Sequence, residues 1–391
     1  MRVDLNSFVE CRSWNGGDET GLTQAVLFGK IKKTPFWPNQ DRDLFKIFDI
    51  RGGFTMTKVV GRNKVNWGIM GTGWIASQFA RDLEHAGNAV KAAVGSRTAE
   101  SAEKFAAEYG FARAYGSYDE MLQDPEVDII YVATPHPLHK ENVLACLEAG
   151  KAVLCEKPFT MNARQLEQLV EKARERNLFL MEGMWTRFLP PITQARAWIA
   201  EGRIGEVRLV KADFGFRVGW EPEGRLLNPD LGGGALLDAG VYPISFASMI
   251  FGEQPQHVWS TANIGQTGVD EQFSVLLSYS EGRSASLNGA IRLNLSNEAV
   301  IYGTEGYIRL PLFLAGKEAY LHVNGQDEPE KFTDDRTCIG YAFEAEEAGR
   351  CILEGRTESR TIQLDESLEI MKLMDTIRGQ WGLRYKSEIN R

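Results

Sequence analysis

The chain has 391 residues, of which 43% are hydrophobic and 25% charged, so it is long enough for two or three domains with a sizeable core. Its net charge of -9 argues against nucleic acid or an anionic membrane as the main partner, and no uninterrupted apolar run is long enough to span a bilayer. The five cysteines form no CxxC pair, which argues against a zinc site and predicts reduced thiols in a cytoplasmic protein.

The first 55 residues differ from the rest in composition and in hydrophobic pattern. They are rich in Gly, Asn, Asp, Phe and Trp and show no sustained hydrophobic period, and a second methionine, Met56, precedes the first convincing strand. We interpret residues 1–55 as an irregular N-terminal extension that is not native to the protein. The alternative is a genuine but irregular extension.

From Lys64 the chain alternates between short apolar strands and amphipathic helices. The pattern predicts strands at 65–70, 89–94, 129–133, 151–155 and 178–181, and helices at 75–86, 99–109, 139–149 and 166–176. Such βαβ units indicate an α/β fold with a doubly wound parallel sheet of the Rossmann type over residues 64–183.

After residue 184 the segments lengthen and alternate between apolar and polar residues. Strands are predicted at 207–216, 273–279, 284–291, 299–302 and 307–310, followed by helices at about 341–353 and 365–380. We expect residues 184–391 to form an α+β domain with a large, open, mostly antiparallel sheet. Its uncovered face predicts a homodimer or a larger homo-oligomer.

The turn after the first strand has the composition GxGxxA: Gly71, Thr72, Gly73, Trp74, Ile75 and Ala76. The first glycine permits a tight turn, the second lets the backbone approach a pyrophosphate, and the helix N-terminus offers free N–H groups. The strand–turn–helix context favours a dinucleotide cofactor over an ordinary tight turn.

The end of the second strand selects the cofactor. An NAD site usually carries an acid there for the ribose hydroxyls, whereas this chain has Ser96 and Arg97. A hydroxyl and a guanidinium suit a 2′-phosphate, so we expect NADP, with NAD possible as the alternative. The structural alternative for Arg97 is a solvated surface arginine.

Two further motifs carry chemistry. A buried strand ends in Glu156-Lys157-Pro158, which places Lys157 at the carboxyl edge of the predicted sheet, where ligands bind. A glycine run leads to Asp238 and Tyr242, near the start of a helix whose N-terminus stabilises a carboxylate. Each residue also has a purely structural alternative. Lys157 could be a solvated lysine at a strand end, Asp238 a helix N-cap and Tyr242 a residue of an amphipathic helix.

In this order and spacing, these motifs resemble those of the glucose–fructose oxidoreductase, inositol dehydrogenase and rhizopine catabolism (Gfo/Idh/MocA) family. The resemblance runs from Lys64 to about Tyr385. The segments 182–190 and 341–348 are most similar to the branch of dimeric dihydrodiol dehydrogenases and NADP-dependent D-xylose dehydrogenases. Inositol dehydrogenase-like members usually have histidine in place of Tyr242, which disfavours inositol as substrate.

The resemblance implies an NADP-linked dehydrogenase that moves a hydride to or from a hydroxyl or carbonyl carbon of a sugar or trans-dihydrodiol. In it Tyr242 is the general acid/base, Lys157 is the cation that lowers the tyrosine pKa, and Asp238 orients the substrate. The hydride chemistry belongs to the cofactor, so no metal is required. The alternatives are an inositol or other polyol dehydrogenase, and a non-catalytic NADP-binding sensor on the same scaffold.

The resemblance also implies cofactor or substrate contacts at the carboxyl ends of later strands. They are Thr134, His136, His139, Glu156, Lys157, Trp185 and Arg187. A metal at the two histidines is the weaker alternative, since no acidic or cysteine partner accompanies them. Trp185 is equally well explained as a core aromatic residue. We expect substrate specificity to lie in 214–228.

Overall fold

The structure is a computed structural model that describes residues 26–29, 44–47, 62–385 and 388. The chain divides into two compact units, Met1–Lys58 and Val59–Arg391. In the first unit the described residues are β1 (Val26–Gly29) and β2 (Leu44–Ile47), which pair antiparallel. The rest of the predicted extension, residues 1–55, lies outside the described residues.

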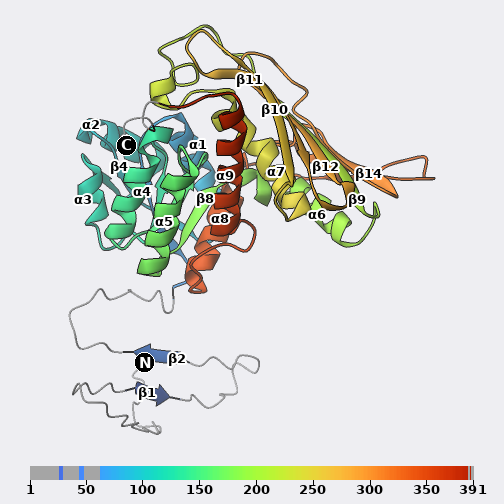
Figure 1. Cartoon of the computed structure of the whole chain (residues 1–391). Helices are drawn as coiled ribbons and strands as arrows, with labels where there is room; N and C mark the ends of the chain where they lie inside the picture. Colours follow the sequence, from blue (N-terminus) through green and yellow to red (C-terminus); the bar gives the residue numbers. More distant parts are fainter. Residues whose placement is uncertain (1–25, 30–43, 48–61, 386–387, 389–391) are drawn as a thin grey trace, which may run out of the picture. The chain divides into compact units, whose positions relative to one another are not determined.

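The first sheet has six parallel strands in the order β5-β4-β3-β6-β7-β8, which confirms the predicted Rossmann fold (Figure 1). Its strands are β3 (Val65–Met70), β4 (Ala89–Gly95), β5 (Arg113–Tyr115), β6 (Ile129–Val132), β7 (Ala152–Glu156) and β8 (Leu180–Gly183). The helices between them are α1 (Trp74–Asp82), α2 (Ala99–Tyr109), α3 (Tyr118–Leu122), α4 (His139–Glu148) and α5 (Ala163–Arg176).

Side-chain alternation along the central strands builds a core on each face of this sheet. Trp67 and Ile69 of β3 point into one core with Tyr131, whereas Met70 and Ile130 belong to the core on the opposite face. Both faces are therefore apolar, which explains why these strands read as continuous hydrophobic runs in the sequence.

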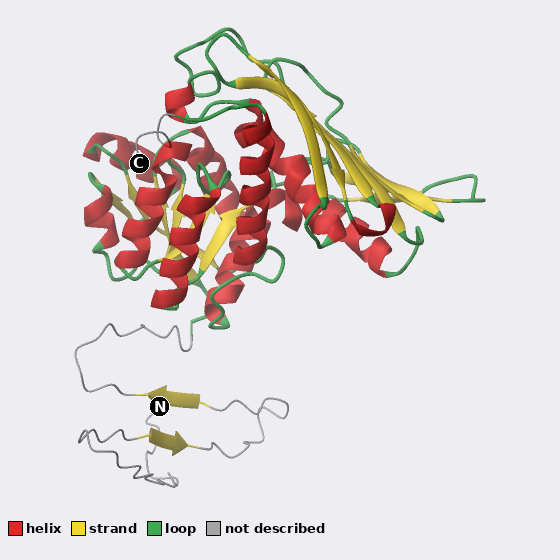
Figure 2. Ribbon diagram, in the orientation of Figure 1, coloured by secondary structure: helices red, strands yellow, loops and turns green. Residues whose placement is uncertain are grey.

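The second sheet has eight strands in the order β10-β11-β12-β9-β13-β14-β15-β16 and is antiparallel except for the β12–β9 pair. Its strands are β9 (Val207–Gly215), β10 (His257–Ile264), β11 (Asp270–Ser278), β12 (Ser284–Ala290), β13 (Ala299–Gly303), β14 (Gly306–Leu310), β15 (Glu318–Val323) and β16 (Glu330–Thr333). Helices α6 (Pro190–Ala200) and α7 (Val241–Phe251) pack on one face. Figure 2 shows the other face of this described sheet without helices, as predicted.

Two helices that follow the second sheet return to the first one. Helix α8 (Tyr341–Leu353) packs on α1, β3 and β4, and α9 (Leu364–Gln380) packs on α5, β8 and α7. The predicted first helix ends early, at Asp82, whose carboxylate accepts hydrogen bonds from the N–H groups of Gly340 (2.6 Å) and Tyr341 (2.8 Å). Asp82 thereby caps α8 from a neighbouring helix and fixes α8 beside the first sheet.

The helical stretch Pro229–Phe251 is long and apolar enough to cross a bilayer by composition, although the sequence showed no uninterrupted apolar run. In the fold, 89% of its apolar window is buried. Its apolar residues therefore belong to the protein core, beneath the second sheet.

Candidate active site

The three residues predicted to be catalytic lie together at the carboxyl end of β7. Lys157 Nζ donates to the backbone oxygen of Asp238 at 2.8 Å and lies 3.8 Å from the Asp238 carboxylate. The same nitrogen lies 4.6 Å from the centroid of the Tyr242 ring. Burial lowers the pKa of Lys157, but Tyr242 and Asp238 outweigh it, so the lysine pKa lies above its ordinary value and the ammonium is stable.

Asp238 sits in a π-helical turn, η5 (Leu236–Gly240), that runs directly into α7. The sequence indicated a helix start at this point but not the extra turn. Its carboxylate accepts a hydrogen bond from Arg225 at 2.7 Å and is almost fully buried. Burial alone would raise the pKa of Asp238, but Lys157 and Arg225 hold it well below its ordinary value, so the carboxylate is ionised at neutral pH.

The glycine run before Asp238 brings a loop onto the site. The Gly234 amide donates to Leu226 O at 3.0 Å, and a Cβ atom on Gly233 would lie only 2.6 Å from that oxygen. The glycines thus allow two backbone segments to approach closely. Because Leu226 is so held, its neighbour Arg225 reaches Asp238, a contact that the sequence could not reveal.

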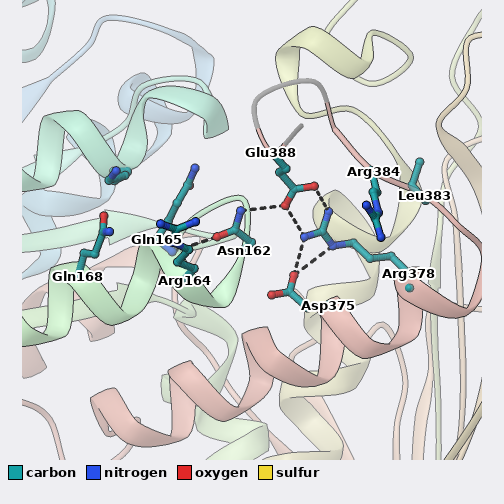
Figure 3. A pocket seen from close by; sticks show the side chains of 11 residues that line it. Asn162, Arg164, Gln165, Gln168, Asp375, Arg378, Leu383, Arg384 and Glu388 are labelled. Carbon is teal, nitrogen blue, oxygen red and sulfur yellow. Dashed lines mark hydrogen bonds and ion pairs between the residues drawn. The ribbon is translucent and has the colours of Figure 1, made fainter. Parts of the chain in front are cut away.

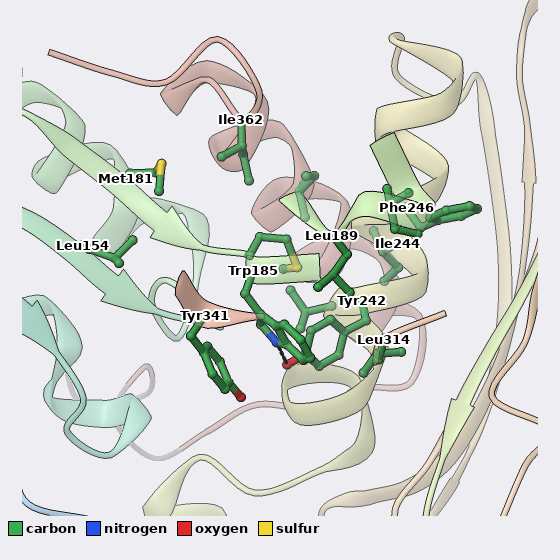
Figure 4. Packing of buried hydrophobic residues seen from close by; sticks show 14 of the residues in the cluster. Leu154, Met181, Trp185, Leu189, Tyr242, Ile244, Phe246, Leu314, Tyr341 and Ile362 are labelled. Atoms are coloured by element: carbon green, nitrogen blue, oxygen red, sulfur yellow. Dashed lines mark hydrogen bonds between the residues drawn. The ribbon is translucent and has the colours of Figure 1, made fainter. Parts of the chain in front are cut away.

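Tyr242 is buried, and its hydroxyl accepts a hydrogen bond from Trp185 Nε1 at 3.2 Å (Figure 4). The ring of Phe214 meets it edge to face, with centroids 5.5 Å apart. Burial raises the tyrosine pKa, and the lowering effect of Lys157 does not overcome it. Lys157 thus acts in the predicted direction, but burial outweighs it, so the pKa of Tyr242 lies above its ordinary value and the side chain is a neutral phenol.

The glycine turn fits a dinucleotide phosphate. Gly71 has φ +108°, and a Cβ atom there would lie 3.1 Å from Ala133 O, so a side chain is disfavoured. The space beside Gly73 is open to 4 Å, and no side chain caps the N-terminus of α1, whose first residues are Trp74 and Ile75. Free N–H groups at a helix N-terminus next to open space suit an anionic group.

The predicted selectivity residues lie at the carboxyl end of β4, beside this turn. The hydroxyls of Ser96 and Thr72 are 3.2 Å apart, which places Ser96 against the glycine turn. Arg97 is exposed and forms no hydrogen bond or ion pair with the described part of the chain. An uncommitted guanidinium at this position is available to a phosphate.

The two predicted histidines differ in their surroundings. Both ring nitrogens of His139 face backbone oxygens, Thr134 O at 2.7 Å and Pro158 O at 2.9 Å, so the ring has no nitrogen left for a cofactor or a metal. Thr134 itself accepts from Asn142 through its hydroxyl. His136 is buried, its pKa is lowered by burial and by His139, and it faces Gly232 O at 3.4 Å, beside the catalytic loop.

Two other predicted cofactor residues are held by the protein itself. Glu156 is buried and accepts hydrogen bonds from the hydroxyl of Tyr131 and, at 3.1 Å, from the Lys157 amide. The Arg187 guanidinium donates to Ser245, to Thr361 O and to both oxygens of Glu366, at 2.8 and 2.9 Å. Arg187 therefore joins α7 and α9 and has no free donor for a cofactor, contrary to the expectation from the sequence.

Comparisons with known proteins agree with this geometry. Residues 65–184 match the family model described as an oxidoreductase family with an NAD-binding Rossmann fold, and residues 192–309 match the GFO/IDH/MocA C-terminal domain. The chain is 38% identical over 330 residues to a trans-1,2-dihydrobenzene-1,2-diol dehydrogenase from Xenopus tropicalis, covering 82% of this chain and 98% of the relative. It is 36% identical over 333 residues to the Homo sapiens enzyme of that name, covering 83% and 99%.

Two solved structures show the same fold. One is a 3-ketoreductase from Actinomadura kijaniata in complex with NADP and TDP-benzene, with 28% identity, a TM-score of 0.72 and coverage of 81% of this chain and 98% of that one. The other is an aldose-aldose oxidoreductase from Caulobacter crescentus complexed with glycerol, with 26% identity, a TM-score of 0.75 and coverage of 82% and 98%. With its glycine turn, its lysine at the end of β7 and these matches, the chain belongs to the Gfo/Idh/MocA family of NAD(P)-dependent oxidoreductases.

Proposed function

We propose that this enzyme carries out reversible NADP-linked oxidation of a hydroxyl group on a trans-dihydrodiol or on a D-xylose-like sugar. The observation that carries the proposal is the convergence of Lys157, Asp238 and Tyr242 beside the glycine turn. The dihydrodiol dehydrogenases to which the chain is similar support the diol, and the similarity to an aldose-aldose oxidoreductase supports the sugar. Residues 64–183 would bind the cofactor and residues 184–391 the substrate.

Each polar group of the site then has a distinct task. Tyr242, oriented by Trp185, donates its phenolic proton to the carbonyl oxygen in the reductive direction and becomes a phenolate, and in the oxidative direction this phenolate takes the proton of the substrate hydroxyl and returns to the phenol. Lys157 stabilises the negative charge that develops on the tyrosine oxygen. The ionised Asp238 accepts a hydrogen bond from a substrate hydroxyl and so orients the substrate. The bound nicotinamide supplies or accepts the hydride.

The cofactor would lie along the glycine turn, with its phosphates on Gly71–Ile75 and its 2′-phosphate near Ser96 and Arg97. The uncommitted guanidinium of Arg97 supports NADP over NAD. His136, Thr134 and Trp185 lie near the proposed catalytic residues and would contact the cofactor or the substrate. His139, Glu156 and Arg187 act by holding the protein around the site.

We further propose a homodimer formed through the open face of the second sheet. Trp259 and Leu276 pair directly across β10 and β11 and are 54% and 47% exposed. On the same side of the sheet, Tyr302, Tyr307 and His322 stack in a row across three strands. An exposed apolar and aromatic face of this kind is typical of a protein interface. Light scattering should give a dimer for the wild type and a monomer for Trp259→Arg.

The unpaired state of all four described cysteines agrees with the cytoplasmic location proposed from the sequence. Fractionation of the producing cells would test it.

The function is tested by following NADPH absorbance with a panel of trans-dihydrodiols, pentoses, hexoses and inositol. We expect turnover with a dihydrodiol or a pentose and none with inositol. A non-catalytic sensor would bind NADPH, measured by fluorescence, but turn over no member of the panel in either direction. Loss of turnover in Tyr242→Phe with NADPH binding retained would assign the proton-transfer role to Tyr242.

A further inference from the structure

A cavity of about 450 Å³ lies at the start of α5, and none of its lining residues belongs to the candidate active site. It is formed by the N-terminal turns of α4 and α5, the end of α9 and the segment that follows α9 (Figure 3). The lining is strongly polar and consists of Lys140, Asn162, Arg164, Gln165, Gln168, Asp375, Arg378, Gly379, Leu383, Arg384 and Glu388.

The two acids in this cavity share one arginine, Arg378, and are otherwise held by neutral donors. Asp375 accepts hydrogen bonds from the Ala163 amide at 2.8 Å and from Arg378 at 2.6 Å. Glu388 accepts from Asn162 at 2.8 Å and from both terminal nitrogens of Arg378, as the dashed lines in Figure 3 show. The Arg378 side chain is 7% exposed, so this cluster forms a fixed inner wall of the cavity.

Three cations remain without a counter-charge. Lys140, Arg164 and Arg384 form no hydrogen bond or ion pair with the described part of the chain, yet all three line the same cavity. In a protein with a net charge of -9, three unmatched cations around one concave surface create a local field that attracts anions. Gln165 and Gln168 add amide N–H groups that can hydrogen-bond to the same ligand.

We propose that this cavity binds a small phosphorylated metabolite, at a site separate from the cofactor turn. Guanidinium groups match the oxygens of a phosphate with paired hydrogen bonds, and the lining has more cations than acids, because Lys140, Arg164, Arg378 and Arg384 face only Asp375 and Glu388. The cavity falls within the size range of small-molecule sites and is larger than a phosphate alone, so the ligand has an organic part as well.

The test is calorimetric titration of the full chain with inorganic pyrophosphate, in buffer without magnesium and with saturating NADP to occupy the cofactor turn. We expect one equivalent to bind, with an affinity that falls as salt is raised. The double variant Arg164→Gln, Arg384→Gln should bind at least tenfold more weakly, at an unchanged Tm. Glu388→Gln should bind more tightly, because Arg378 loses one of its two acidic partners.

The matched control is Arg360→Gln, which removes an exposed arginine outside the cavity and should leave binding unchanged. Absence of binding to the wild type, or equal binding by the double variant, would overturn the proposal. Loss of binding in Arg97→Gln would also overturn it, since pyrophosphate would then occupy the cofactor turn. No catalytic turnover enters this experiment, so its outcome is independent of the proposed reaction.

Discussion

The guanidinium of Arg225 lies 2.7 Å from Oδ1 of Asp238, so a loop residue holds the carboxylate that is proposed to orient the substrate. The Arg225 side chain is 45% exposed and Asp238 only 9%, so Arg225 lies on the solvent side of the carboxylate. Asp238 also faces Lys157, and the two cations together keep it ionised.

Replacing Arg225 should weaken substrate use without removing catalysis. In Arg225→Gln the Asp238 carboxylate keeps Lys157 as its partner but loses the group that fixes its position. We expect kcat/KM to fall about tenfold, equivalent to about 1.4 kcal/mol of transition-state stabilisation, mostly through KM. Arg360→Gln, which removes an exposed arginine outside the site and outside 214–228, is the control. Equal effects of both variants would argue against a specific role for the Arg225–Asp238 pair.

The raised pKa of Tyr242 predicts how the reaction rates in the two directions depend on pH. A group that donates a proton must be protonated, and burial keeps this phenol protonated beyond the ordinary tyrosine value of about 10. Carbonyl reduction should therefore show no loss of rate attributable to Tyr242 up to about pH 10. Lys157→Met removes the group that lowers this pKa, so in that variant the oxidative direction should lose more rate at neutral pH than the reductive direction. Steady-state rates in both directions, measured from pH 6 to 10, provide the check.

Much of the fold could be predicted because both faces of the first sheet are buried. Val65–Met70 and Ile129–Val132 read as continuous apolar runs, so strands and parallel order follow from local pattern. By contrast, β10 was missed because Trp259 lies exposed on the open face, which removes the contrast between apolar and polar positions. The return of α8 to the first sheet depends on Asp82, a contact between residues distant in sequence, which no local pattern reports.

The candidate site was predictable at the level of motifs but not of contacts. Lys157, Asp238 and Tyr242 were identified because strand ends and glycine runs are local features of the sequence. Arg187 was assigned to the cofactor because it follows a strand of the Rossmann sheet, and only packing reveals that α7 and α9 bind its guanidinium. The lowering effect of Lys157 on the pKa of Tyr242 was predicted, but the larger opposing effect of burial was not, because the depth of burial is a tertiary property.

The cofactor assignment makes a quantitative prediction for Arg97. Because a charge-assisted hydrogen bond to phosphate contributes about 1.5–3 kcal/mol, Arg97→Gln should lower kcat/KM for NADP by roughly 10- to 100-fold. The value for NAD, which lacks the 2′-phosphate, should hardly change. The ratio of kcat/KM for the two cofactors measures the effect, and a ratio equal to that of the wild type would refute the assignment.

Asp270 makes stability depend on pH. Its carboxyl is buried, accepts the Leu236 amide at 2.6 Å beneath the turn that holds Asp238, and has its pKa raised by burial to about 7. The unfolded carboxyl loses its proton near pH 4 while the folded one keeps it, so stability falls as pH rises from about 4 to 7. Asp270→Asn should flatten this slope in urea unfolding measured at pH 5 and pH 7. Part of the slope should remain, because Glu182 also has a pKa of about 7 through burial.

Substitution of Arg187 distinguishes a structural role of this residue from a role in binding the cofactor. Its side chain is 2% exposed and pairs with Glu366, so Arg187→Met leaves that acid without its cation. Breaking a buried pair by removing one partner typically costs about 3–5 kcal/mol, and the free energy of unfolding should fall by that order. The KM for NADPH should stay within about twofold, because no donor of Arg187 is free for a ligand. Arg97→Gln should give the opposite result, with stability retained and the KM for NADPH raised. If Arg187→Met instead raised that KM at unchanged stability, the guanidinium would have to leave Glu366 when the cofactor binds, and the assignment of Arg187 to the joint between α7 and α9 would fail.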